Sequence, residues 1–138
     1  MSQLQGLEPE LTSLGYEIIA LAPDKPDEIS KMMDQMDQSG RGYTVLSDQE
    51  MSAARAFGVS FTVDEKTREN LTGFGIDLEA ASGKTHHQLP VPAVFIAGTD
   101  GTLRFTYVNP DYRIRIHPDV VLAAAKAALD PESWNPKH

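Results

Sequence analysis

The chain of 138 residues contains no cysteine. It therefore has no disulfide, no thiolate nucleophile and no sulfur ligand for a metal. It also lacks any apolar run near the roughly 20 residues that a membrane-spanning helix needs. A basic segment followed by an apolar one is missing from its N-terminus. We therefore expect a soluble, cytoplasmic protein that has no membrane partner.

Positive charge is also scarce, because 12 lysines and arginines stand against 20 aspartates and glutamates, for a net charge of −8. Such a surface repels phosphate backbones, so we expect no nucleic-acid partner. Hydrophobic content of 41% and charged content of 23% are close to globular averages. We predict one domain over residues 1–130, followed by a tail at 131–138.

Three stretches carry apolar residues at helical spacing, three and four positions apart. The first precedes Gly15, the second begins after Pro26, and the third begins at Pro118. Their apolar positions are Leu4, Leu7, Leu11 and Leu14, then Ile29, Met32, Met33 and Met36, and finally Val120, Val121, Leu122 and Leu129. We predict a helix in each stretch.

Strand patterns lie between these helices. Residues 16–22 are typical of a buried parallel strand, 43–46 and 59–63 of short strands, and 93–96 with 103–108 of a β-hairpin. Ser47 and Glu50 match a capping box for a short helix near Met51. Residues 64–89 have no clear period and are predicted as a long loop or insertion. The order predicts an α/β sandwich with a mixed sheet.

Four segments together resemble one known family. They are Leu14–Asp24, then Val45–Asp48 with Ala54–Gly58, then Pro90–Phe95, and finally Tyr107–Arg115. In order and spacing they resemble the peroxiredoxin-like proteins of the alkyl hydroperoxide reductase and thiol-specific antioxidant group, within the thioredoxin-like superfamily. The resemblance implies an antioxidant oxidoreductase that reduces peroxides or disulfides through a cysteine and takes electrons from a thiol reductant protein. It implies no cofactor.

The resemblance also implies a cis peptide bond before Pro92, because the family's matching proline is cis and faces the reactive thiol. We expect a binding groove around this proline. Its candidate residues are Val91, Pro92, Asp24, Arg104, Arg113 and Arg115. The three arginines are included because peroxiredoxins use a guanidinium to hold the thiolate and polarise the peroxide. Arginines that alternate along a strand are, however, more typical of a solvated face.

The family's reactive cysteine lies at the start of the helix that residues 4–14 resemble, after a central strand. Neither the cysteine nor that strand precedes the helix here, and Ser2 cannot form a sulfenic acid. Two interpretations stay open. Either the chain is the downstream part of a longer enzyme, which we favour, or it is a thiol-free relative that serves as a non-catalytic binding module. A trans bond before Pro92, or a sheet whose middle is complete without another segment, would overturn the interpretation that the chain is a sulfur-presenting scaffold without its sulfur-bearing piece.

Other polar residues give weaker signals. His86 and His87, with His117 further on, lack a carboxylate at ligand spacing and are typical of solvent-exposed histidines, so we predict no metal site. Asp24 follows a buried strand at the end where open α/β sheets bind ligands. A turn-forming aspartate before Pro26 is the simpler interpretation.

A sheet without its central strand leaves open edges that can pair with another chain. We therefore predict a homodimer or swapped assembly. Size-exclusion chromatography with light scattering should give a mass greater than that of one chain. A clean monomer of full thermal stability would contradict the missing-strand argument.

Overall fold

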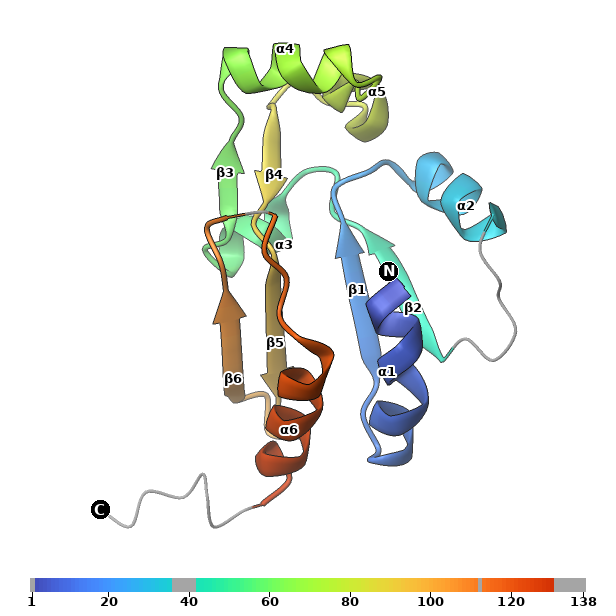
Figure 1. The fold of residues 1–138 in the computed structure, drawn as a ribbon, viewed down its shortest axis with the longest axis vertical. Helices are drawn as coiled ribbons and strands as arrows, with labels where there is room; N and C mark the ends of the chain where they lie inside the picture. The colour runs from blue at the N-terminus through green and yellow to red at the C-terminus, as the bar shows by residue number, and fades with distance from the viewer. Residues whose placement is uncertain (1, 36–41, 112, 131–138) are drawn as a thin grey trace. The chain divides into compact units, whose positions relative to one another are not determined.

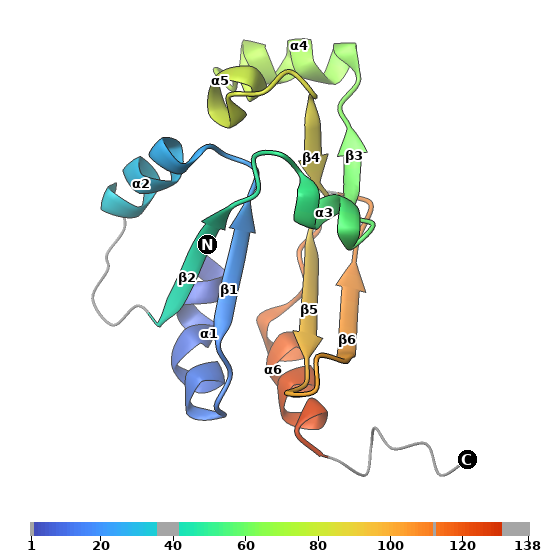
Figure 2. The same ribbon diagram turned by 180° about the vertical axis from the view of Figure 1, so that it is seen from behind.

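The computed structural model describes residues 2–35, 42–111 and 113–130, and shows a mixed α/β protein (Figures 1 and 2). The predicted tail at 131–138 and the helix position Met36 lie outside the described residues. The chain divides into two compact units, which are described separately. We call residues 1–18 with 92–138 the terminal unit, and residues 19–91 the middle unit.

The terminal unit packs two helices with a β-hairpin. Its elements are α1 (Ser2–Ser13), β5 (Ala93–Ala97), β6 (Leu103–Val108) and α6 (Pro118–Ala128). Helix α6 lies against both strands and against α1. The buried core consists of Leu11, Ile96, Ala125 and Ala128, with Leu7, Leu14, Tyr16, Ile18 and Phe105 packed around it. The predicted apolar stripe of the first helix is thus confirmed at Leu7, Leu11 and Leu14.

One hydrogen bond and one glycine turn shape the segment that follows α1. The Tyr16 hydroxyl donates to the Ala125 carbonyl at 2.6 Å, which ties the segment after α1 to α6. Gly15 follows α1 with φ of +89°, a left-handed conformation that glycine adopts without strain. Pro9 lies inside α1 and cannot donate the hydrogen bond of an ordinary helical residue. Packing on α6, rather than intrinsic propensity, stabilises α1.

The predicted hairpin is confirmed. Strands β5 and β6 pair antiparallel, with Val94 opposite Tyr107 and Ile96 opposite Phe105. The register shifts between Ile96 and Ala97, next to the turn that contains Gly101 at φ of +80°. Gly and Asp at this turn are the residues that tight hairpin connections favour.

The middle unit begins with a β–α–β segment. Its elements are β1 (Ile18–Ala22), α2 (Pro26–Gln35) and β2 (Tyr43–Ser47). Strands β1 and β2 pair with each other and point the same way, as a helical crossover requires (Figure 1). Helix α2 packs against β2 and buries Ile29 and Met33. Its first turn carries Asp27 and Glu28, which favour the positive end of the helix dipole as predicted.

Helix α3 (Ser52–Ala56) begins in an unexpected way. The predicted capping box is wrong: the Ser47 hydroxyl donates to the Asp24 carbonyl, and Glu50 pairs with Lys84. The Asp48 carboxylate accepts from the amides of Ala53 and Ala54 instead, at 3.0 and 2.9 Å. A carboxylate has enough lone pairs for two amides, so it replaces the serine and glutamate of the box.

The residue just before α3 is Met51, which is fully buried and has φ of +59°. A left-handed backbone is strained for a side chain of this size. The Asp48 contacts and the burial of Met51 therefore act together to fix the turn.

Residues 64–89 are not a long loop, so that part of the prediction is wrong. They contain α4 (Glu65–Gly73), α5 (Leu78–Ser82) and the start of β4 (Gln88–Pro90), and β4 pairs antiparallel with β3 (Ser60–Thr62). The side chains of Asp64 and Asp77 cap the two helices by accepting from Thr67 and Ala80 amides. Helix α4 has no buried residue, which is why no apolar period marks it in the sequence.

The mixed α/β class is confirmed, but the strands do not form the single mixed sheet that we predicted. Among the described residues they form three separate pairs, β1 with β2, β3 with β4, and β5 with β6. Each strand therefore has one partner and one edge that carries no paired strand in the described part of the chain. No helix in residues 2–35, 42–111 and 113–130 is long and apolar enough to cross a membrane.

The two hydrogen bonds that the Asp48 carboxylate accepts from backbone amides can be tested by substitution. Asp48→Ala should lower the free energy of unfolding by about 1 to 2 kcal/mol, the upper part of the range for loss of a helix cap. Urea denaturation measures the change. Glu50→Ala, which removes the glutamate of the discarded capping box, should cost less because its ion pair with Lys84 is exposed. Equal effects of the two substitutions would contradict this account.

Candidate functional site

The middle unit holds a small pocket at the carboxyl end of β1. Its volume is about 20 Å³, and it is enclosed by the turn after β1, by α5 and by the start of β4. The polar residues that line it are Asp24, Ser82, His86, His87 and Gln88. The structure thus brings together Asp24 and the histidine pair, which are about sixty residues apart in the sequence.

Backbone hydrogen bonds fix the turn that carries Asp24. The Asp48 amide donates to the Ala22 carbonyl at 2.7 Å, and the Lys25 amide donates to the Ala81 carbonyl at 2.9 Å. The Ser47 hydroxyl donates to the Asp24 carbonyl at 2.7 Å. Three other parts of the middle unit therefore hold this one turn.

The Asp24 carboxyl group lies in an unfavourable place for a charge. Partial burial raises its pKa above the ordinary value, and repulsion by Glu28 raises it further. No hydrogen bond to this carboxylate offsets that cost among the described residues. The structure therefore places the Asp24 carboxylate in the pocket without a compensating hydrogen bond from the described residues.

His86 has a structural role. Its Nε2 lies 2.7 Å from the Gln49 carbonyl, and its Nδ1 accepts from the Gln88 amide at 2.9 Å. The carbonyl requires an N–H at Nε2, and the amide requires a lone pair at Nδ1. Both nitrogens are therefore occupied by the backbone.

His87 makes a different kind of contact. Its backbone has φ of +51°, and its Nε2 lies 3.0 Å from Arg68 Nη1 and 2.5 Å from Glu79 Oε1. Arg68 and Glu79 come from α4 and α5, and neither was predicted from the sequence as a site residue. No local spacing connects them to His87, so only the fold reveals the cluster.

The pocket at the end of β1 is too small for a large ligand, and its polar side chains can bind water or exchange protons. A volume of about 20 Å³ has room for one or two water molecules. Within the described residues no group of three or more His, Asp or Glu side chains is placed to hold a metal ion. His117 caps α6 by accepting from the Asp119 amide.

The structure corrects the prediction for Pro92. No cis peptide bond occurs among the described residues, so the bond between Val91 and Pro92 is trans. The trans form is the intrinsically favoured one. Extended pairings fix both flanks, because the Val91 amide donates to the Val59 carbonyl and the Asn109 amide donates to the Pro92 carbonyl. Pro92 is buried.

The three candidate arginines have different surroundings in the terminal unit. Arg104 Nη1 donates to the Ala128 carbonyl at 2.8 Å, and its guanidinium lies so close to Gly98 that a Cβ there would overlap it. Arg113 makes a two-point ion pair with Asp111, and Arg115 is exposed. Arg104 thus holds the end of α6, and the structure does not bring the three guanidinium groups to one point.

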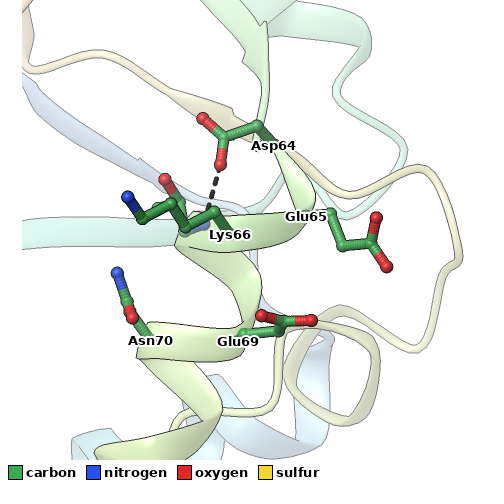
Figure 3. A pocket seen from close by; sticks show the side chains of 6 residues that line it. Asp64, Glu65, Lys66, Glu69 and Asn70 are labelled. Carbon is green, nitrogen blue, oxygen red and sulfur yellow. Dashed lines mark hydrogen bonds between the residues drawn. The ribbon is translucent and has the colours of Figure 1, made fainter.

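An open hollow at the start of α4 carries no site. Its volume is about 660 Å³, and it is lined by Asp64, Glu65, Lys66, Thr67, Glu69 and Asn70. Figure 3 shows the Glu65 and Glu69 carboxylates on one side of the helix and Lys66 with Asn70 on the other. The Asp64 carboxylate is already used by the Thr67 amide at 2.7 Å. The side chains diverge and form no common binding point.

The structure defines a mixed α/β protein with small sheets. The AhpC/TSA family profile matches residues 1–106, most of the chain. The chain therefore belongs to the AhpC/TSA family, and membership implies a thioredoxin-like fold. A search of curated proteins and a search of solved structures gave no match.

The raised pKa of Asp24 gives a prediction with a definite sign. Ionisation costs folding free energy here, and the cost is present at neutral pH and vanishes as pH falls below the ordinary carboxyl pKa of about 3.9. Asp24→Asn should therefore stabilise the protein at neutral pH, and the gain should disappear in acid. Urea denaturation at neutral pH and at a pH below about 3.9 measures the change in the free energy of unfolding.

Asp100→Asn is the matched control of opposite sign. Hydrogen bonding from the Thr102 amide lowers the pKa of Asp100, so loss of its charge should destabilise the protein at neutral pH. A destabilising Asp24→Asn substitution at neutral pH would show that the Asp24 carboxylate is satisfied.

Proposed function

We propose that this chain is the scaffold of a peroxiredoxin-like thiol oxidoreductase and that its reacting sulfur comes from a cysteine outside these 138 residues. The observation that carries the proposal is the AhpC/TSA family match over residues 1–106 in a chain with no cysteine. On this proposal the 138 residues alone do not turn over peroxide.

The chemistry explains why another sulfur is needed. A thiolate attacks one oxygen of a peroxide, the O–O bond breaks, and the products are a sulfenic acid and, after protonation of the leaving oxygen, water or an alcohol. A second thiol then reduces the sulfenic acid to a disulfide with release of water, and a thiol reductant protein restores the thiol. Serine is not oxidised in this way, and a methionine sulfoxide forms no disulfide with a second thiol, so no residue of this chain replaces the cysteine.

The sheet edges are consistent with a missing strand. Strands β1 and β5 each have a single paired neighbour in the described part of the chain, β2 and β6 respectively. An unpaired edge exposes backbone amides and carbonyls that favour strand addition. On the proposal, the thioredoxin-like sandwich is completed by a central strand that carries the cysteine, and association with a second copy is the other way to cover these edges. The proposal places the enzyme in the cytoplasm.

The trans bond at Val91 and Pro92 favours the second candidate, a non-catalytic binding module. A thiol-free relative has no reactive sulfur for a cis proline to face. In that case Val91, Pro92, Asp24, Arg104, Arg113 and Arg115 are the residues to test for binding, although the three arginines have separate surroundings.

The central prediction concerns peroxide consumption. The purified chain, mixed with hydrogen peroxide and excess dithiothreitol, should consume no peroxide beyond the dithiothreitol background except by slow oxidation of its five methionines. Peroxide consumption above the dithiothreitol background should therefore stop at five equivalents per chain or fewer. A colorimetric peroxide assay and the mass of the protein measure it. Turnover well beyond five equivalents would contradict the assignment of the sulfur to another segment.

The codons in frame upstream of Met1 separate the two candidates. The enzyme proposal expects them to encode a strand that ends in Trp-Cys or in Pro-x-x-x-Thr-x-x-Cys. Their absence would remove the enzyme proposal and leave the binding module.

A further inference from the structure

The parallel strand pair of the middle unit carries an exposed apolar surface. Strands β1 and β2 lie side by side, and more exposed and less exposed positions alternate along each of them (Figures 1 and 2). The exposed large apolar side chains are Ile19 and Leu21 of β1 and Leu46 of β2, which keep 55%, 48% and 46% of their surface exposed. All three belong to the middle unit. We call them the β1–β2 face.

The other side of the strand pair is the covered one. Alternate residues of a strand point to opposite sides, so Leu46 lies on the opposite side of β2 from Tyr43. Tyr43 is buried, and helix α2 packs against β2. Because parallel strands are ordinarily buried on both sides, an apolar side that stays exposed indicates a surface for a further contact.

The charge of the face indicates the kind of partner. The strand sequences, IIALA in β1 and YTVLS in β2, contain no charged residue, although the whole chain has a net charge of −8. A basic partner is matched by acidic side chains within its binding surface. Two identical acidic chains repel each other, so they associate best where neither carries charge. The uncharged face therefore fits a second copy of the chain better than a basic protein.

We propose that the β1–β2 face is a self-association surface, on which a second copy of this chain places the same face. In such a two-fold dimer the same patch is used by both copies, so apolar side chains cover apolar side chains. The contact is made by side chains, which distinguishes it from pairing through strand edges. The proposal goes beyond the proposed function, because the dimer needs neither a cysteine nor a peroxide.

The size and the borders of the face set the strength of the dimer. Stable protein interfaces bury about 1,200–2,000 Å² in total, more than three partly exposed side chains from each copy supply. We therefore expect a weak, reversible dimer that forms at high protein concentration. Glu17 precedes β1 and Asp48 follows β2, so acidic residues lie next to the ends of the two strands. Salt screens their repulsion and should strengthen the dimer.

Sedimentation equilibrium of the whole chain, over a wide range of protein concentration, tests the proposal. The average mass should rise with concentration from that of one chain toward that of two. The dissociation constant should be lower at about 0.15 M salt than at about 0.01 M, because the screening length falls from about 30 Å to about 8 Å. A chain that stays monomeric at every concentration, or a dimer that weakens with salt, would overturn the proposal.

Two substitutions on neighbouring strands locate the surface. Leu21→Glu should raise the dissociation constant at least about tenfold, because the two-fold symmetry brings a carboxylate from each copy into an apolar contact. Leu46→Glu should have the same effect from β2. Leu103→Glu is the matched control, because Leu103 is 45% exposed and lies on β6 of the terminal unit. It should leave the dissociation constant unchanged.

Circular dichroism shows whether each variant keeps its fold. If Leu21→Glu fails to fold, Leu46→Glu decides the matter. Association that survives both strand substitutions would assign the contact to strand edges or to another surface, and so would association that Leu103→Glu weakens as much. Either result would refute the β1–β2 face while leaving the peroxide assay, and with it the proposed function, unaffected.

Discussion

The turn that follows β1 is the constraint on which the middle unit depends. Its backbone groups lie where a parallel strand ends, and each must find a partner away from the sheet. The amide of Asp48, the hydroxyl of Ser47 and the carbonyl of Ala81 supply these partners from β2, its following loop and α5. The position of Asp24, and of the pocket that it lines, follows from these three bonds.

The chain belongs to its family by sequence but contains no cysteine. The family match covers residues 1–106, so the chain belongs to the AhpC/TSA family. The chemistry that such a scaffold supports needs a sulfur atom that changes oxidation state, and no cysteine supplies it here. Titratable groups are instead gathered at the Asp24 pocket and at His87.

The parts of the fold that local patterns specify were predictable from the sequence. The leucine stripe of α1 and the alternating strands around Gly101 are local signals, and both features appear in the structure. Helices α4 and α5 were missed because α4 buries no residue and so leaves no apolar period. Their aspartate caps, Asp64 and Asp77, were the signal that was available.

The candidate site was predictable only in fragments. Asp24 and the histidine pair were each visible in the sequence, but their meeting in one pocket depends on β3–β4 pairing and on the placement of α5. The bond before Pro92 shows a limit of prediction from a resemblance. The resemblance implied a cis bond at this proline, and the structure has a trans bond. Long-range contacts of this kind have no local sequence signature.

The division of the chain has a consequence for how the protein forms on the ribosome. The middle unit is continuous in sequence, from residue 19 to 91, whereas the terminal unit joins residues 1–18 to the segment after residue 91. The continuous unit can acquire its contacts as soon as it leaves the exit tunnel. Helix α1 must wait until α6 has been synthesised, since α6 is the helix it packs against, and closing this long loop has an entropic cost. During translation, the leucine face of α1 therefore stays without its helical partner until α6 has been made.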